Sequence, residues 1–333
     1  MCLPLITLVL NIMGLKKMIL LIWSLKGGGQ MKNIRGYETF VKVEPLHKGW
    51  SGDQKYYIET AEGRRLLLRI ADSSEYSRKK TEFAMMGQVA ALGVPMSRPV
   101  DFGICDNGRS VYLLLTWCEG EDAEIVLPRL TEQEQYRLGK ESGELLKRIH
   151  SLPAPEEGEE WSSRFNRKAS QKIEKYKACG IKLNGDTEMT GYIENNRHLL
   201  AGRPQYYQHG DYHTGNMIVS GENTLSIIDF NRFDFGDPWE EFNRIVWSAA
   251  VSPQFATGQL DGYFGGKPPL EFFRLLAFYI SSNLLSSIPW AIPFGEEEVV
   301  TMKKQAEEVL GWFDDMRNPV PTWYLQDSLM ERG

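Results

Sequence analysis

Residues 208–241 constrain this chain more than any other stretch. Two short apolar runs, 217–219 and 225–228, flank the polar turn 220–223 and predict a β-hairpin. A polar loop, 209–216, enters the hairpin, and Asp229 ends it. Carboxylates and an amide at one end of a rigid hairpin suit a hard cation and an oxygen nucleophile. We therefore expect the functional site to form here.

Length and charge limit the class of protein. The 333 residues are 42% hydrophobic and 25% charged, which is ordinary for a folded chain with two lobes and separate cores. The net charge of −6 argues against a general nucleic-acid binder, although it leaves room for a local basic pocket for a nucleotide. No paired spacing links the four cysteines, so we expect free thiols and a cytoplasmic protein; they are Cys2, Cys105, Cys118 and Cys179.

Residues 1–30 differ from the rest. Lys16-Lys17 interrupts their apolar runs, so neither run is long enough to span a bilayer, and the lysines follow the first run, which fits a secretory signal poorly. Lys26-Gly27-Gly28 is what a purine-rich ribosome-binding sequence would encode just upstream of Met31. We expect Met31 to be the natural start and residues 1–30 to be a translated leader or disordered extension. A short membrane anchor is the alternative.

Residues 31–116 form a half rich in predicted strands. A glycine-containing turn at 48–53 would let backbone N–H groups approach phosphate oxygens, but most such turns bind nothing. Arg69 lies at the inner end of a strand and is, by itself, most simply exposed to solvent. A helix over 75–92 carries Glu82, which matters only if it turns toward Arg69. The strands are predicted at 40–43, 55–60, 65–70, 99–104 and 111–117.

The second half is mostly helical, so the fold class is α+β. We place a β-rich lobe at 31–116, a hinge at 117–121 and a helical lobe at 122–333. The helices are predicted at 132–151, 165–179, 189–200, 240–250, 270–286 and 296–313.

Two kinds of chemistry fit the polar loop. His209-Gly210-Asp211-Tyr212-His213 has the composition of a metallohydrolase loop, but a binuclear site needs further histidines, and the remaining three, His47, His150 and His198, lack ligand spacing. Asp211 and Asn216 instead have the spacing of a phosphoryl-transfer loop, in which the Asp receives the hydroxyl proton and the Asn holds magnesium. Asp229, one strand later, stands where a second magnesium ligand is required. This order of parts favours phosphoryl transfer.

The same residues resemble the aminoglycoside phosphotransferase family of kinase-like enzymes. The resemblance rests on His209-Gly210-Asp211-x-His213-x-Gly215-Asn216, Ile227-Ile228-Asp229-Phe230 and Gly236-Asp237-Pro238, and it covers about residues 34–315. It implies a bilobal protein-kinase-like fold whose N-terminal lobe binds nucleotide. It also implies transfer of the ATP γ-phosphate, with Mg²⁺, to a hydroxyl of a small molecule.

The resemblance assigns roles to individual residues. Asp211 is the catalytic base, Asn216 and Asp229 bind Mg²⁺, and His209 and Asp237 support the loop. The nucleotide-binding set comprises the glycine turn, a phosphate-binding cation with its helix partner, and the adenine hinge: Gly49, Ser51, Gly52, Arg69, Glu82, Thr116, Trp117 and Cys118. Protein kinases have Lys where this chain has Arg69. A guanidinium group differs from an ammonium group in length and geometry, so Lys48 or Lys55 could share the role of Arg69.

Two Asp-Phe-Gly triplets spell the magnesium motif of protein kinases. The first, 101–103, precedes the catalytic loop, and the second, 234–236, follows Asp229, which already ends the apolar strand. We expect Asp229-Phe230-Asn231 to be the working triplet, with Asp234 as the lesser alternative.

The acceptor is expected to be a small alcohol, since the short interval between Asp229 and Gly236 has no room for an activation segment. An acidic wall for polycationic aminoglycosides could come from Glu240, Glu241, Asp261 and residues 296–298, although the last group more simply begins a helix. An apolar pocket could come from Trp239, Trp247, Phe264 and Trp290, unless they are core. We expect no nucleic-acid partner, no stable membrane association, and a monomer or weak dimer. The alternative function is a catalytically silent nucleotide-binding regulatory protein on the same fold.

Overall fold

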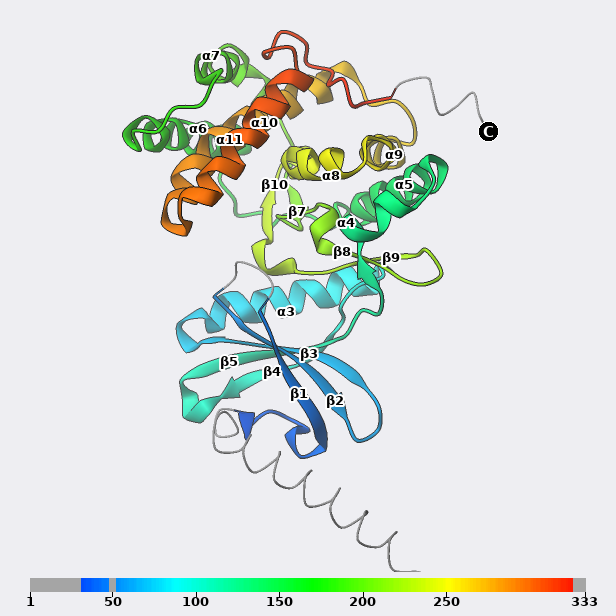
Figure 1. Cartoon of the computed structure of the whole chain (residues 1–333). Coiled ribbons are helices and arrows are strands. Elements are labelled where there is room, and N and C mark those ends of the chain that lie inside the picture. The colour runs from blue at the N-terminus through cyan, green and yellow to red at the C-terminus, as the bar shows by residue number, and fades with distance from the viewer. Residues whose placement is uncertain (1–30, 48–51, 326–333) are drawn as a thin grey trace, which may run out of the picture. The chain divides into compact units, whose positions relative to one another are not determined.

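A computed structural model describes residues 31–47 and 52–325 (Figure 1). The predicted leader, 1–30, and two residues of the glycine turn, Gly49 and Ser51, lie outside the described residues. The chain divides into two compact units. Unit 1 comprises Met1–Gly87 and Ser97–Trp117, and unit 2 comprises Gln88–Met96 and Cys118–Gly333.

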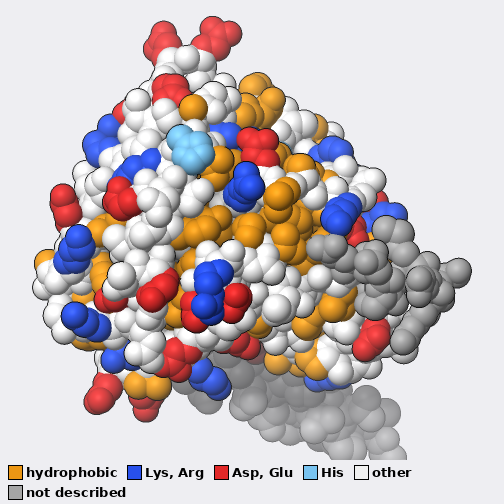
Figure 2. Space-filling view, turned by 90° about the horizontal axis from the view of Figure 1, so that it is seen from above, with side chains coloured by type: hydrophobic (Ala, Val, Ile, Leu, Met, Phe, Trp, Pro, Cys, Tyr) orange, Lys and Arg blue, Asp and Glu red, His pale blue; other side chains and the backbone are white. Residues whose placement is uncertain are grey.

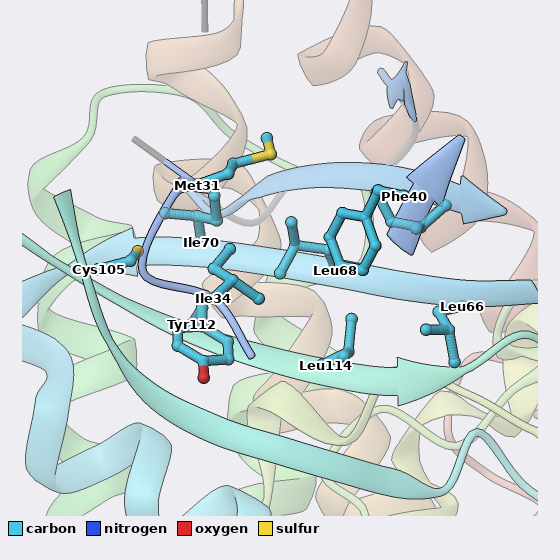
Figure 3. Close-up of a cluster of buried hydrophobic side chains, with 10 residues drawn as sticks. Met31, Ile34, Phe40, Leu66, Leu68, Ile70, Cys105, Tyr112 and Leu114 are labelled. Atoms are coloured by element: carbon cyan, nitrogen blue, oxygen red, sulfur yellow. The ribbon is translucent and has the colours of Figure 1, made fainter. Parts of the chain in front are cut away.

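Unit 1 is built on a five-stranded antiparallel sheet with the order β1-β2-β3-β5-β4. Alternating apolar residues put Leu66, Leu68 and Ile70 on one face, where they join a buried cluster with Met31, Ile34 and Phe40 (Figure 3). Helix α3 (Tyr76–Ala91) packs the Phe83 ring on Phe102 of β4. The strands are β1 (Phe40–Leu46), β2 (Gln54–Thr60), β3 (Arg65–Asp72), β4 (Pro99–Cys105) and β5 (Ser110–Thr116).

Unit 2 is mainly helical. Its helices are α4 (Ala123–Val126), α5 (Glu132–Ile149), α6 (Trp161–Ala178), α7 (Asp186–Asn196), α8 (Ile245–Val251), α9 (Pro253–Phe264), α10 (Leu270–Ala291) and α11 (Glu296–Trp312). Two small sheets lie among them. One has the order β6-β8-β9, from β6 (Glu121–Asp122), β8 (Met217–Val219) and β9 (Leu225–Ile227), and the other pairs β7 (Tyr206–Gln208) with β10 (Asp234–Gly236). The α+β fold expected from the sequence is therefore present, as is the hairpin.

Helices α5 and α9 cross with their backbones in direct contact. A Cβ atom added at Gly139 or Gly143 of α5 would lie 2.1 or 2.0 Å from a carbonyl oxygen of α9. The reciprocal positions, Gly258 and Gly262 of α9, are equally close to the backbone of α5, at 2.2 and 2.1 Å. Only glycine permits this approach. The two helices therefore pack at a separation that only glycine at these four positions allows.

Helix α10 is the core helix of unit 2. Among the described residues, Leu270–Phe294 is the one segment long and apolar enough to cross a membrane, and 67% of that window is buried inside the protein. Figure 2 shows one face of the molecule, seen from the top of Figure 1, where acidic and basic side chains are mixed around hydrophobic ones. This face does not resemble the uniformly basic surface of a nucleic-acid binder.

Several predicted boundaries were wrong. The sequence analysis missed α9, whose Gly258 and Gly262 lower helix propensity but are required by the crossing. The helix predicted at 240–250 is a 3-10 turn, Glu240–Arg244, followed by α8. Helix α6 starts at Trp161, four residues before its predicted start, because Glu160 caps it by accepting from Ser163 N.

Candidate active site

The phosphate-binding cation expected on β3 lies in a buried cluster of four charges. Arg69 is only 2% exposed, so it is not the solvent-exposed arginine that its position alone suggested. Its Nη1 donates to Glu82 Oε1 at 2.9 Å and its Nε to Asp53 Oδ2 at 3.0 Å. Lys79 donates from Nζ to the same two carboxylates, at 2.6 Å to Asp53 and 3.2 Å to Glu82. Burial raises the pKa of Asp53, but Arg69 and Lys79 outweigh it, so the pKa lies below its usual value.

The cluster contains two residues that sequence reasoning missed, Asp53 and Lys79. The second cation beside Arg69 is Lys79, whereas Lys48, one of the residues expected to help, lies outside the described residues, and Lys55 is the cross-strand partner of Arg69. Lys79 could have been found, because it precedes Glu82 by three residues and therefore lies on the same face of α3. Gly52, the one described member of the glycine set, precedes β2 next to Asp53.

The expected hinge follows β5. Thr116 ends the strand, and its Oγ1 accepts from Arg98 N at 2.8 Å. Trp117 N donates to Arg65 O at 3.1 Å, and its ring stands edge-on to Tyr57 at 4.9 Å. Cys118 is the first residue of the chain's second stretch in unit 2, and burial raises the pKa of its thiol to about 11, which keeps it protonated. The three predicted hinge residues therefore include the second of the two points at which the chain passes from unit 1 to unit 2.

The predicted catalytic loop brings Asp211 and Asn216 into contact. Asn216 donates from Nδ2 to the carbonyl oxygen of Asp211 at 2.9 Å and to its Oδ2 at 3.2 Å. Because the amide nitrogen is used on Asp211, the amide oxygen Oδ1 is the atom left for a metal. Ile228 N donates to Asn216 O at 3.0 Å, which holds the residue preceding Asp229 against Asn216. The predicted base and the two predicted ligands thus come from one end of the β8–β9 hairpin.

Asp229 has a left-handed backbone, with φ 64° and ψ 61°, at the exit from β9. Such a conformation is uncommon outside glycine and often marks a functional position. A carboxylate and an amide oxygen are the hard ligands that Mg²⁺ prefers, and nucleotide phosphates and water normally complete its shell. The donors present therefore fit Mg²⁺. Among the described residues no group of three or more His, Cys, Asp or Glu side chains is placed to hold a metal.

His209 is fully buried and hydrogen-bonds the loop. Its Nε2 lies 2.9 Å from Ile228 O, and its Nδ1 accepts from Asp211 N at 3.3 Å. Gly210 N donates to both oxygens of Glu241, at 3.0 and 3.1 Å. Burial raises the pKa of Glu241, but His150, His209 and this backbone donor together hold it below its usual value. Glu241 therefore anchors the loop, and it is a residue that sequence reasoning placed on an acidic wall.

Asp237 is fully buried among four donors. Arg203 donates to both of its carboxylate oxygens at 2.8 Å, Tyr279 donates its hydroxyl at 2.7 Å, and Trp239 donates its backbone N–H at 3.0 Å. Trp161 Nε1 in turn donates to the Tyr279 hydroxyl at 2.9 Å. Backbone anchoring was expected from the sequence, but the side chains of Arg203 and Tyr279 were not.

Both Asp-Phe-Gly triplets lie in strands. Asp101 of β4 accepts from the Tyr112 hydroxyl at 2.7 Å. Asp234 of β10 accepts from Arg164 Nη2 at 2.7 Å, and the residue pairs with Gln208 of β7. Each carboxylate thus has a structural partner of its own.

The comparison with known families now bears on this geometry. Residues 42–273 match the model of the phosphotransferase enzyme family, abbreviated APH. The chain belongs to this family. No curated protein matches the chain.

Solved structures show the same fold as this phosphotransferase. Amicoumacin kinase hAmiN, in a complex with AMP-PNP, Ca²⁺ and Ami, has 13% identity and a TM-score of 0.60, covering 84% of this chain and 90% of its own. A thermostable mutant of the aminoglycoside phosphotransferase APH(4)-Ia, in a ternary complex with AMP-PNP and hygromycin B, has 13% identity and a TM-score of 0.60, covering 84% and 95%. A choline/ethanolamine kinase family protein from Mesorhizobium loti has 15% identity and a TM-score of 0.58, covering 84% and 91%. At such identities the likeness shows the fold alone.

Several residues of the acidic wall expected for a polycationic substrate have other contacts or positions in the structure. Glu241 accepts from the backbone N–H of Gly210 in the predicted catalytic loop, and Asp261 accepts from the hydroxyls of Tyr136 and Tyr324 at 2.9 and 2.8 Å. Residues 296–298 begin helix α11. The predicted aromatic pocket is also partly core, since Trp239 and Phe264 pack against buried Phe272.

Helices α5 and α9 hold the residue that follows Asp211. The Tyr212 hydroxyl donates to Ser142 O at 2.8 Å, and Gln259 Nε2 donates to Ser142 Oγ at 3.0 Å. Ser142 and Gln259 each lie beside a contact of the glycine crossing. The crossing of the two helices therefore helps to position the predicted catalytic loop.

Proposed function

We propose that this chain is an ATP- and Mg²⁺-dependent O-phosphotransferase that moves the γ-phosphoryl group to a hydroxyl of a small molecule. The observation that carries the proposal is the contact of Asn216 with both the carbonyl and carboxylate oxygens of Asp211, at the hairpin end from which Asp229 leaves. Family membership supports phosphotransfer, while the nucleotide, the metal and the hydroxyl acceptor are our inference from these residues.

In the proposed reaction, Asp211 orients the acceptor hydroxyl and receives its proton through a carboxylate oxygen. The acceptor oxygen forms a bond to the γ-phosphorus, the bond from that phosphorus to the bridging oxygen breaks, and ADP leaves. Bound through Asn216 and Asp229, Mg²⁺ would offset the charge of the phosphates. Arg69 would bind phosphate oxygens. Its guanidinium group also donates to Asp53 and Glu82, so the phosphate would share this group with two carboxylates.

The test is an ATP/Mg²⁺ turnover screen over aminoglycosides, macrolides, amino alcohols, sugars and hydroxy acids. We expect Asp211→Asn to lower kcat by at least about a thousandfold and to spare ATP binding, because only the proton acceptor is removed. Asp229→Asn should weaken the dependence on Mg²⁺, whereas the matched control Asp234→Asn should keep both properties. Unchanged turnover of Asp211→Asn would refute the base assignment. Tight ATP binding without turnover of any acceptor would favour the silent regulatory protein.

The free thiols support a proposal about the cellular compartment. Among the described residues, Cys105, Cys118 and Cys179 are free, and we propose a reducing, cytoplasmic environment for the enzyme.

A further inference from the structure

The two buried cations of unit 1 both donate to one oxygen of Asp53. Arg69 donates to Asp53 Oδ2 from Nε at 3.0 Å and from Nη2 at 2.5 Å, and Lys79 donates to the same oxygen from Nζ at 2.6 Å. Both cations are buried, so each needs an anionic partner in place of water. Phosphate oxygens accept charge-assisted hydrogen bonds from guanidinium and ammonium groups in the same manner. The Asp53 carboxylate therefore gives these cations the kind of contact that a nucleotide phosphate would give.

Glu82 contacts the same cations in a different way. It is fully buried on α3, and its two oxygens accept separately from Arg69 Nη1 at 2.9 Å and from Lys79 Nζ at 3.2 Å. Because Lys79 is three residues earlier in the same helix, the two side chains share one face of α3. Glu82 leaves the Nε–Nη2 edge of Arg69 to Asp53, and this edge of a guanidinium group is suited to bidentate binding of phosphate. Glu82 thus orients the cations, and Asp53 lies on the edge that a phosphate would use.

Asp53 can leave the cluster without breaking the sheet. It lies in the bend before β2, and the pairing of β2 with β3 begins one residue later, at Gln54. Arg69, in contrast, is paired within β3, and Lys79 and Glu82 lie inside α3. The side chain of Asp53 is 9% exposed, against 6% or less for the other three. Asp53 is therefore the member of the cluster that a ligand can displace.

We infer that Asp53 is an internal mimic of a nucleotide phosphate: its carboxylate binds Arg69 and Lys79 in the nucleotide-free protein, and the phosphate chain of the nucleotide displaces it and binds both cations. The inference rests on the proposed function and adds Lys79 to the phosphate-binding residues. Exchange of one anion for another keeps the buried cations paired throughout, which avoids the cost of an unpaired buried charge. The contact also lowers the affinity for nucleotide, because the hydrogen bonds to Asp53 must first break.

Nucleotide binding to the full chain tests the inference, because a purely structural role of Asp53 predicts no gain in affinity when its charge is removed. Calorimetry measures the Kd of a non-hydrolysable ATP analogue with Mg²⁺, of ADP and of adenosine. Asp53→Asn keeps the shape of the side chain and removes its charge. It should lower the Kd of the analogue and of ADP by at least about fivefold and leave that of adenosine unchanged. Its Tm without nucleotide should fall, since the cations lose their anion.

The matched control is Glu62→Gln, which removes one negative charge from the exposed turn between β2 and β3 and should change neither Kd nor Tm. An unchanged or higher Kd of the analogue in Asp53→Asn would overturn the inference, and so would an equal gain for adenosine. If Asp53→Asn is unfolded without ligand, ADP should restore its fold, because phosphate replaces the lost carboxylate. Failure of ADP to do so would also overturn the inference.

A second variant tests the role of Lys79. Lys79→Met should raise the Kd of the analogue by at least about threefold, because the phosphate chain carries more charge than one carboxylate and loses more when the ammonium group is removed. Lys79→Arg, which keeps the charge, should restore most of the affinity, and adenosine should bind equally to all three proteins. Unchanged binding of the analogue to Lys79→Met would overturn the assignment of Lys79.

Turnover separates the inference from the proposed function. Asp53→Asn should lower the ATP KM and leave the acceptor KM unchanged. Equal nucleotide affinities of the wild-type chain and Asp53→Asn, with turnover intact, would overturn the inference and leave phosphotransfer standing. Binding of no nucleotide by either protein would contradict the proposed function and the inference together.

Discussion

The glycine crossing gives the most direct test of how this fold holds its catalytic loop. In Gly143→Ala the new Cβ would lie 2.0 Å from Gln259 O and 2.6 Å from Tyr263 N. Since ordinary contact begins at 3.4 Å, helices α5 and α9 must separate by about 1.4 Å at this point. Backbone cannot rotate away as a side chain can, so we expect a cost near the upper end of the usual range for overpacking, about 3 kcal/mol. Alanine returns about 1 kcal/mol of helix propensity, which leaves a net loss of about 2 kcal/mol.

The assay is urea or thermal unfolding followed by circular dichroism. A net loss of this size should lower Tm by about 4–8 °C for a unit as large as unit 2. The control is Gly191→Ala in α7, where an added Cβ meets nothing within 4 Å, and we expect it to be neutral or slightly stabilising. The Gly143→Ala protein that remains folded should also lose kcat, because Ser142 shifts and releases Tyr212 beside the base. Equal Tm values for the two variants would refute the reasoning.

Three further predictions concern buried charges. Lys79→Met should cost about 3 kcal/mol, measured by urea unfolding, because two buried carboxylates would then share one cation. Because the pKa of Asp53 is lowered in the folded protein, its carboxylate stabilises the fold fully above about pH 3.8, its ordinary pKa. This stability is lost as the pH falls from there through the lower pKa of the folded state. Asp53→Asn should therefore reduce the fall of Tm at acid pH. Asp237→Asn should cost about 3–5 kcal/mol, against about 1–2 kcal/mol for Tyr279→Phe, which removes one hydrogen bond; equal losses would contradict this ranking.

The central residues of the candidate site could be predicted from the sequence because they lie close together in the chain. Asp211, Asn216 and Asp229 belong to one hairpin, and a hairpin fixes which residues lie at its end. The supports of the loop could not be found in this way. Glu241 binds Gly210 from 31 residues away, and Tyr279 binds Asp237 from 42 residues away. Such pairings depend on how helices pack, which no local pattern encodes.

Helix α9 shows the same limit for the fold. Gly258 and Gly262 have low helix propensity, so they argue against a helix. They favour the fold because they allow close packing against the matching pair in α5, Gly139 and Gly143. The spacing of four residues between glycines, present in both helices, was the available signal. This spacing predicts a close helix crossing only when the two helices are known to be neighbours.

The charged cluster of unit 1 bears on the proposed function. In unit 1, Arg69 and Lys79 are matched by Asp53 and Glu82, so this cluster is already neutral, and a nucleotide phosphate must compete with Asp53 for the arginine. A cluster of matched charges can stabilise the fold without a ligand.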